Sequence, residues 1–112
     1  MLDRFYSASL KDELLAEYFI EALGDEMISD AWQHHLTLLT DFWAAMLLGD
    51  KSYQGQPIKP HMHMEGLKRE TFERWLALFS KTVEGYYAPP QAEAFKSRGA
   101  LIAENFMKLL HL

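Results

Sequence analysis

The chain contains no cysteine among its 112 residues. A disulfide framework, an iron–sulfur cluster and a thiolate metal site are therefore excluded. Basic residues are also scarce: Lys and Arg number 11 against 16 Asp and Glu, and the formal net charge is −5. Because a nucleic-acid surface needs a basic stripe, this balance argues against a nucleic-acid partner.

Long apolar runs are missing as well. A membrane-spanning helix needs about 18 apolar residues in a row, and Asp41 interrupts the most apolar stretch before that length is reached. Near the start, Asp3 and Arg4 place charge where the apolar part of a signal peptide would begin. We therefore expect a soluble, cytoplasmic protein with no membrane partner.

Apolar and aromatic side chains are abundant, at 49% and 13% of the residues. A chain of this length can bury roughly two thirds of the surface that it exposes when unfolded. We therefore expect residues 1–112 to form a single domain. The aromatic share is high enough for some of these rings to line a ligand site as well as a core.

The spacing of apolar residues is helical almost throughout, and no segment is typical of a strand. It predicts two short helices, over about residues 2–10 and 14–19, with a turn near Asp12 between them. After a break at Gly24, Ser29 or Asp30 is expected to cap a longer helix over about residues 31–48. The predicted fold class is therefore all-α.

Proline divides the second half of the chain. The segment from Gly49 to Pro60 is expected to be a non-helical loop, and Pro60 is placed to begin a helical turn that carries His61. A long helix is expected from about Lys68, and a last helix after Pro89-Pro90. The inner face of that last helix is expected to carry Phe95, Gly99, Ile102, Phe106 and Leu109.

Two histidines lie in apolar surroundings. His35 shares a helical stripe with Leu39, Phe42 and Met46. His61 follows the loop that proline and glycine restrict. A histidine at the edge of an apolar cavity can hold a metal, and a second one opposite it indicates a ligand pocket; for His61 the alternative is a half-buried structural histidine.

Several ordered motifs together span nearly the whole chain. They are Phe5-Tyr6, His35 with Asp41-Phe42-Trp43, Tyr53-Gln54-Gly55-Gln56-Pro57 with His61, and Phe72 with Arg74-Trp75-Leu76. In the order and spacing of these motifs the sequence resembles the truncated haemoglobins, and most closely their group III. The resemblance implies a two-over-two helical sandwich around haem b (iron protoporphyrin IX), in which one globin helix is reduced to a loop.

The resemblance also implies how the iron is held. His61 is expected to be its axial ligand, because a neutral, rigidly held imidazole suits haem iron. On the opposite side, Tyr6 and Trp75 are expected to donate hydrogen bonds to a diatomic ligand through the phenolic hydroxyl and the indole N–H. His35 is expected at the cavity entrance, where donation to the ligand, gating and binding of the iron itself are open alternatives.

The porphyrin needs an apolar wall and partners for its propionates. By the same resemblance, Phe19 and Phe42 are expected to pack on the porphyrin faces. Lys59, Arg69 and Tyr53 are the candidate propionate partners. The remaining wall is expected to come from Leu39, Met46, Tyr53, Ile58, Leu67 and Phe72.

The implied function is the binding of oxygen, nitric oxide or carbon monoxide. Several hydrogen-bond donors at the ligand should hold oxygen too tightly for simple delivery. This favours redox chemistry of the ligand, such as oxidation of nitric oxide to nitrate or peroxidase-like turnover, with electrons from an external donor. Two alternatives remain: a haem sensor or carrier with both His35 and His61 on the iron, and a haem-free helical interaction module.

Overall fold

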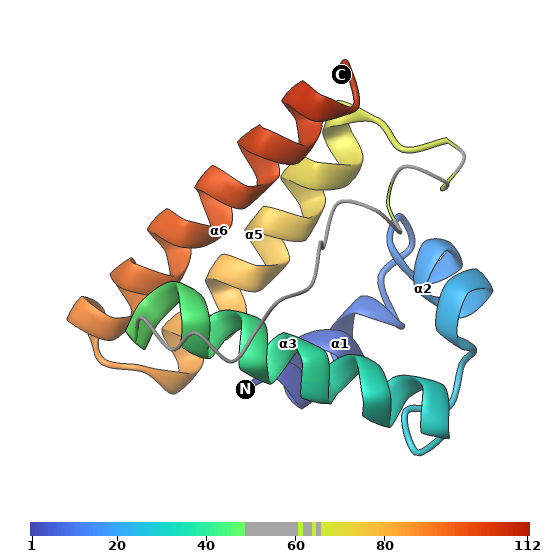
Figure 1. Ribbon diagram of the computed structural model, residues 1–112, viewed down its shortest axis with the longest axis horizontal. Helices are drawn as coiled ribbons and strands as arrows, with labels where there is room; N and C mark the ends of the chain where they lie inside the picture. Colours follow the sequence, from blue (N-terminus) through green and yellow to red (C-terminus); the bar gives the residue numbers. More distant parts are fainter. Residues whose placement is uncertain (49–60, 62–63, 65) are drawn as a thin grey trace. The chain divides into compact units, whose positions relative to one another are not determined.

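The computed structural model describes residues 1–48, 61, 64 and 66–112, and every regular element within them is a helix. The all-α prediction is therefore confirmed for the described residues (Figure 1). The chain divides into two compact units, Met1–Gly55 and Gln56–Leu112, and each is taken by itself below. The predicted loop from Gly49 to Pro60 lies outside the described residues. That residues 1–112 form one domain stays a prediction.

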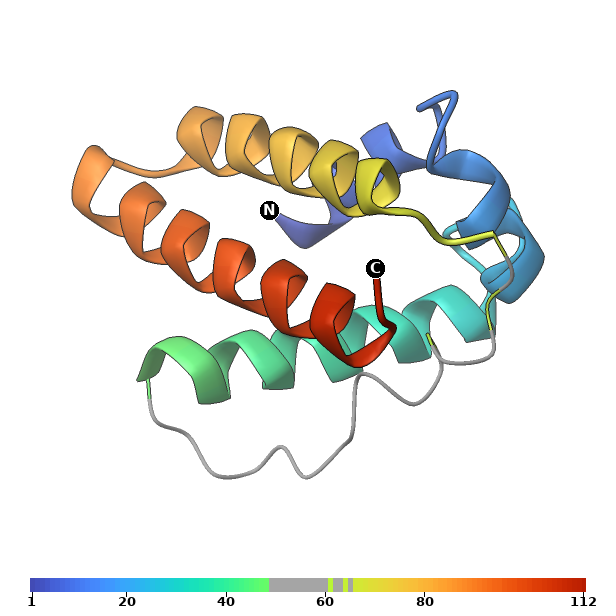
Figure 2. The same ribbon diagram turned by 90° about the horizontal axis from the view of Figure 1, so that it is seen from above.

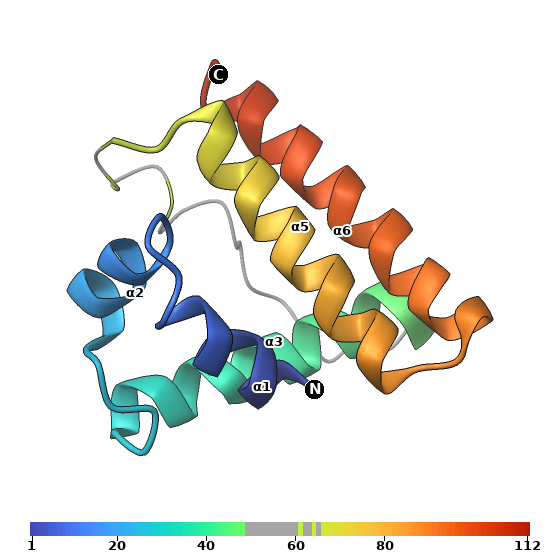
Figure 3. The same ribbon diagram turned by 180° about the vertical axis from the view of Figure 1, so that it is seen from behind.

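The first unit is built from three helices. They are α1 (Leu2–Ser9), α2 (Ala16–Leu23) and α3 (Asp30–Leu48). Helix α1 packs against α3, and Figure 3 shows this pair from behind. The buried face of α1 consists of Phe5, Tyr6 and Ser9, which recur at helical spacing. The Ser9 hydroxyl donates to the Phe5 carbonyl at 2.9 Å, so this buried polar group is satisfied within the helix.

Local side-chain hydrogen bonds shape the turns that precede α2 and α3. The Asp12 carboxylate accepts the backbone N–H groups of Leu14 and Leu15 at 2.9 and 3.1 Å, which closes the turn before α2. The Ser29 hydroxyl accepts the N–H of Trp32 at 3.3 Å and caps the first turn of α3. The predicted turn at Asp12 is confirmed, and of the two predicted cap residues, Ser29 and Asp30, Ser29 is the one that caps α3.

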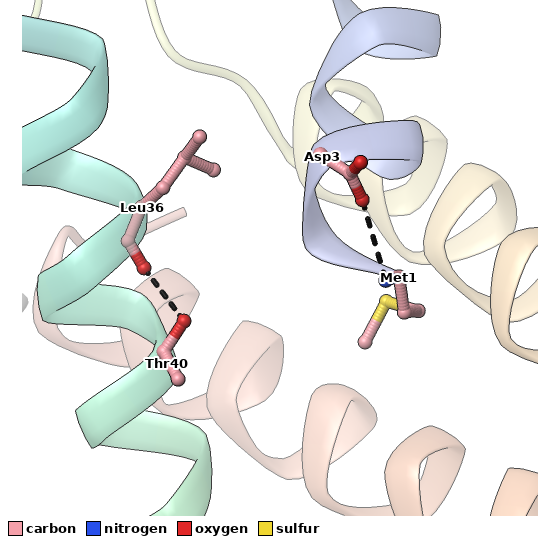
Figure 4. A network of polar contacts seen from close by, with 4 residues as sticks. All are labelled: Met1, Asp3, Leu36 and Thr40. Carbon is pink, nitrogen blue, oxygen red and sulfur yellow. Dashed lines mark hydrogen bonds and ion pairs between the residues drawn. The ribbon is translucent and has the colours of Figure 1, made fainter.

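Polar groups on α1 and α3 also find partners close by in the sequence. The Met1 ammonium donates to the Asp3 carboxylate at 3.3 Å, and the Thr40 hydroxyl donates to the Leu36 carbonyl at 2.9 Å (Figure 4). The hydrogen bond from the ammonium lowers the pKa of the Asp3 carboxyl below its usual value. A negative charge in the first turn also complements the positive end of the α1 dipole.

The second unit contains a pair of long antiparallel helices. They are α5 (Arg69–Tyr86) and α6 (Pro89–Leu109). The two run side by side, as Figure 2 shows. A Cβ atom added at Gly99 of α6 would lie 3.2 Å from Cδ2 and Cε2 of Phe79, so glycine permits this close approach. Phe79 and Val83 of α5 are fully buried.

The predictions for these two helices need two corrections, one to the start of α6 and one to its inner face. Helix α5 begins beside the predicted Lys68, whose N–H donates to the Thr71 hydroxyl at 3.2 Å. Helix α6 begins at Pro89 and not after Pro90, because proline suits the first helical turn, where its missing N–H has no helical partner. Leu109 is 58% exposed and was wrongly assigned to the inner face of α6.

The error at Leu109 has a geometric cause. An α-helix turns by about 100° per residue, so a residue ten positions after Gly99 points about 80° away from it. The other residues predicted for that face are buried or half-buried, and Ala92 and Ala103 are buried as well.

Within the described ranges, no helix combines the length and the apolar character needed to cross a bilayer.

Candidate functional site

Three aromatic side chains of the first unit gather around a fourth, Tyr6. The ring centroid of Tyr6 lies 5.3 Å from that of Phe19, 5.6 Å from Trp32 and 5.2 Å from His35. The rings meet edge-on or tilted, which is the arrangement that aromatic side chains prefer. We call Tyr6, Phe19, Trp32 and His35 the Tyr6 cluster. Because it draws on α1, α2 and α3, it joins all three helices of the unit.

Tyr6 is a polar side chain in an apolar setting. It is only 5% exposed, and its burial raises the pKa of the phenol well above the usual 10.0. Burial acts in this direction because a low-dielectric environment disfavours the phenolate. The Tyr6 hydroxyl therefore keeps its proton at physiological pH and can act as a hydrogen-bond donor.

His35 brings a second polar group into the cluster. Its ring meets Tyr6 at an interplanar angle of 78° and Trp32 at 86°, so both contacts are edge-on. The His35 ring as a whole is half-buried, while its Nε2 atom is buried. The adjacent His34 is exposed. Of these two neighbours, only His35 has ring contacts with the cluster.

Trp32 is the member of the cluster that the sequence analysis did not single out. It is fully buried, and its Nε1–H donates to the Gly24 carbonyl at 2.8 Å. A signal for it was available, since Trp32 lies three residues before His35 and such residues share one face of a helix. What the sequence did not reveal is the partner, because a backbone carbonyl carries no sequence signature.

The residues of α3 that were predicted to line the haem pocket form a half-buried stripe along the helix. Leu39, Phe42 and Met46 are each half-buried, at the spacing that the sequence predicted. Phe42 also meets Trp43 edge-on, with ring centroids 5.6 Å apart. Two further residues predicted for the wall, Tyr53 and Ile58, lie outside the described residues.

His61 is the central candidate of the second unit. Its backbone is helical, and its carbonyl accepts the Met64 N–H at 3.2 Å. Its half-buried imidazole lies 4.9 Å from the ring of Phe106, which in turn meets Phe72 edge-on at 6.3 Å. Phe72 was predicted as a site residue, whereas Phe106 was assigned only to the inner face of α6. Pro60, expected to begin the turn at His61, lies outside the described residues.

Two more predicted residues lie on α5 and one precedes it. Trp75 stacks on Phe79 with centroids 5.2 Å apart and planes 4° from parallel. Arg69, a candidate propionate partner, donates from its guanidinium to the Leu112 carbonyl at 3.2 Å. Leu67 is half-buried just before the helix begins. The other two propionate candidates, Lys59 and Tyr53, lie outside the described residues.

The helical fold and the aromatic surroundings of two histidines are those expected of a globin. No model of a protein family matches the sequence. The chain is 32% identical over 111 residues to group 3 truncated hemoglobin ctb of Campylobacter jejuni subsp. jejuni, covering 99% of this chain and 86% of that protein. Its structure is similar to the crystal structure of the group III truncated hemoglobin from Campylobacter jejuni.

That structural match has a TM-score of 0.83 and 36% sequence identity, and it covers 95% of this chain and 82% of the other. The chain belongs to the group 3 truncated haemoglobins. The predicted family and the predicted truncated-globin fold are therefore confirmed. Membership implies haem-based binding of small diatomic gases, so a haem-free helical interaction module is set aside.

The described side chains fit a haem. No group of three or more His, Asp or Glu side chains within the described ranges could hold a bare metal ion. A haem iron needs only one or two protein ligands, because the porphyrin supplies the rest, and imidazole is a common choice. His61, half-buried against the Phe106 ring, has the right donor chemistry for this task.

Proposed function

We propose that this chain binds haem b with His61 as the axial ligand, and that Tyr6, His35 and Trp75 supply hydrogen-bond donors for a diatomic ligand. The Tyr6 cluster is the observation that carries the proposal. A phenol that keeps its proton and an imidazole with a buried Nε2 lie together among aromatic rings. A protonated phenol and an imidazole can both donate hydrogen bonds, so their position side by side in one cluster favours a role in binding a ligand.

The role of His61 follows from its chemistry and its packing. When bound, haem supplies an iron that takes diatomic gases and exchanges single electrons. To serve as a ligand, the His61 imidazole must be neutral and held in one orientation. Contact with the Phe106 ring at 4.9 Å restricts how the imidazole can turn, which supports this role.

For the wall of the haem pocket we propose the apolar residues that the sequence indicated. The half-buried stripe on α3 supports this, because apolar side chains that are only partly covered offer surface to a flat apolar group. Phe19 and Phe42 would pack on the porphyrin faces. The remaining proposed wall residues are Leu39, Met46, Tyr53, Ile58, Leu67 and Phe72.

The strength of the hydrogen bonds that these side chains would donate to bound oxygen favours redox chemistry over oxygen delivery. A hydrogen bond to a charged acceptor contributes about 1.5–3 kcal/mol, which slows ligand release roughly ten- to a hundredfold. With three such donors, Tyr6, His35 and Trp75, oxygen would stay too long for efficient delivery. We propose that the protein combines oxygen with nitric oxide to give nitrate. Nitrate takes its nitrogen and one oxygen atom from nitric oxide and its other two oxygen atoms from oxygen, and an external donor, expected in the cytoplasm, supplies the one electron that the step consumes.

The experiment mixes the reduced, oxygen-loaded protein with one equivalent of nitric oxide and measures nitrate. We expect close to one nitrate per haem in a single turnover. Oxygen that escapes before nitric oxide arrives, with no nitrate formed, would contradict the redox proposal. A Tyr6→Phe variant serves as the comparison, because faster escape of oxygen should lower its nitrate yield when nitric oxide is added slowly.

A further inference from the structure

We infer that Trp32 is a positioning residue that fixes Tyr6 and His35 relative to each other; the inference rests on the proposed role of those two residues as ligand donors. The indole ring of Trp32 contacts both, with centroids 5.6 Å from Tyr6 and 5.5 Å from His35. Tyr6 lies on α1 and His35 on α3, so one side chain touches donors from two helices.

Trp32 is itself anchored at two points. Its backbone N–H donates to the Ser29 hydroxyl at 3.3 Å, and its indole Nε1–H donates to the Gly24 carbonyl at 2.8 Å. Phe19 of α2 covers the indole as well, with centroids 6.1 Å apart. Because the ring is fully buried and held by a directional hydrogen bond, its orientation is fixed.

The anchor depends on an unusual backbone conformation. Gly24 follows α2 with a backbone φ of +88°, an angle that residues other than glycine rarely adopt. A Cβ atom added there would meet nothing within 4 Å. A substitution of Gly24 therefore acts on the backbone, and so on the direction of the carbonyl that Trp32 bonds, without a steric clash.

The consequence concerns the two donors. If the Trp32 ring turns, the surfaces against which Tyr6 and His35 pack turn with it. A hydrogen bond weakens steeply when its donor is misaligned. Loss of the anchor should therefore weaken the bonds that Tyr6 and His35 make to a ligand, although Trp32 itself does not touch that ligand.

The test compares Trp32→Phe, which keeps an aromatic ring and removes the N–H, with Trp43→Phe on the same helix. Trp43 is also buried but is not a member of the Tyr6 cluster. We measure the oxygen dissociation rate and the infrared stretching frequency of added carbon monoxide. Trp32→Phe should speed oxygen release about two- to tenfold, the effect of one ordinary hydrogen bond, and shift the carbon monoxide band. Trp43→Phe should change neither.

Further variants separate the possible outcomes. In a background of Tyr6→Phe and His35→Leu, Trp32→Phe should have no further effect on oxygen release; a persisting effect would overturn the positioning role. If Trp32→Phe does not fold, Gly24→Ala carries the test, and it should speed both oxygen release and hydrogen exchange of the Trp32 indole N–H. If the Trp32 and Gly24 variants release oxygen at the rate of the unsubstituted protein while Tyr6→Phe releases it faster, the positioning role of Trp32 alone is overturned. An unchanged rate in Tyr6→Phe would overturn the proposed function too.

Discussion

Replacing Tyr6 by phenylalanine should remove a donor while leaving the aromatic packing in place. The ring of Tyr6 keeps its contacts with Phe19, Trp32 and His35 in such a variant, because these contacts involve the ring and not the hydroxyl. The Tyr6 hydroxyl is neutral and buried, so a hydrogen bond from it to a charged acceptor contributes about 1.5–3 kcal/mol. We expect oxygen release to become roughly ten- to a hundredfold faster.

The assay is stopped-flow displacement of oxygen by carbon monoxide. Tyr18→Phe is the matched control, since it removes another phenolic hydroxyl from the same unit, and Tyr18 is only half-buried on α2. The control should release oxygen at the rate of the unsubstituted protein. If Tyr6→Phe also releases oxygen at that rate, the hydroxyl does not reach the ligand and the reasoning fails.

The same residue predicts a dependence of stability on pH. Burial raises the pKa of the Tyr6 phenol above the 10.0 of an ordinary tyrosine, so the folded chain keeps a proton that the unfolded chain loses. The contribution of the protonated Tyr6 phenol to the free energy of unfolding is fully present below pH 10. It is lost as the pH rises above 10, by about 1.4 kcal/mol per pH unit. Tyr6→Phe should lack this extra loss. Parallel alkaline denaturation curves for the two proteins would show that the phenol is not buried.

Two other predictions concern the helix pair and the iron ligand. Gly99→Ala should lower the free energy of unfolding by about 0.5–2 kcal/mol, because the cost of placing a Cβ 3.2 Å from the buried Phe79 ring exceeds the gain from replacing a helical glycine. Gly85→Ala should instead raise the free energy of unfolding by about 0.5–1 kcal/mol, because an added Cβ there would meet nothing within 4 Å. Equal effects of the two substitutions in chemical denaturation would refute the close approach at Gly99. Acidification should release haem, because an imidazole must be neutral to bind iron, and a native absorbance spectrum that persists well below about pH 4 would count against His61.

Local chemistry made much of the fold predictable. The turn at Asp12 and the cap at Ser29 depend on side chains that bond backbone N–H groups within three residues, so the sequence alone contains both partners. Helical spacing likewise predicted the half-buried stripe on α3. It failed at Leu109 because small angular offsets accumulate along a helix as long as α6.

Contacts between distant segments were not predictable in the same way. The bond from Trp32 to the Gly24 carbonyl depends on a backbone angle, and no residue pattern specifies which carbonyl an indole will reach. The contact of His61 with Phe106 depends on how α6 packs beside a segment 45 positions earlier in the sequence. Tyr6, Phe19 and His35 were each chosen from the resemblance to truncated haemoglobins; that they meet in one cluster emerged only from the structure.

Binding of haem iron by His61 is the central claim, and a cavity variant tests it most directly. The visible spectrum is recorded for His61→Gly with haemin, in the ferric, ferrous and carbon monoxide states, before and after free imidazole is added. His111→Gly, at an exposed histidine, is the control. The account predicts that the haem band of the native protein is lost in His61→Gly, restored by imidazole and unchanged in the control. A native spectrum in His61→Gly without imidazole would contradict it.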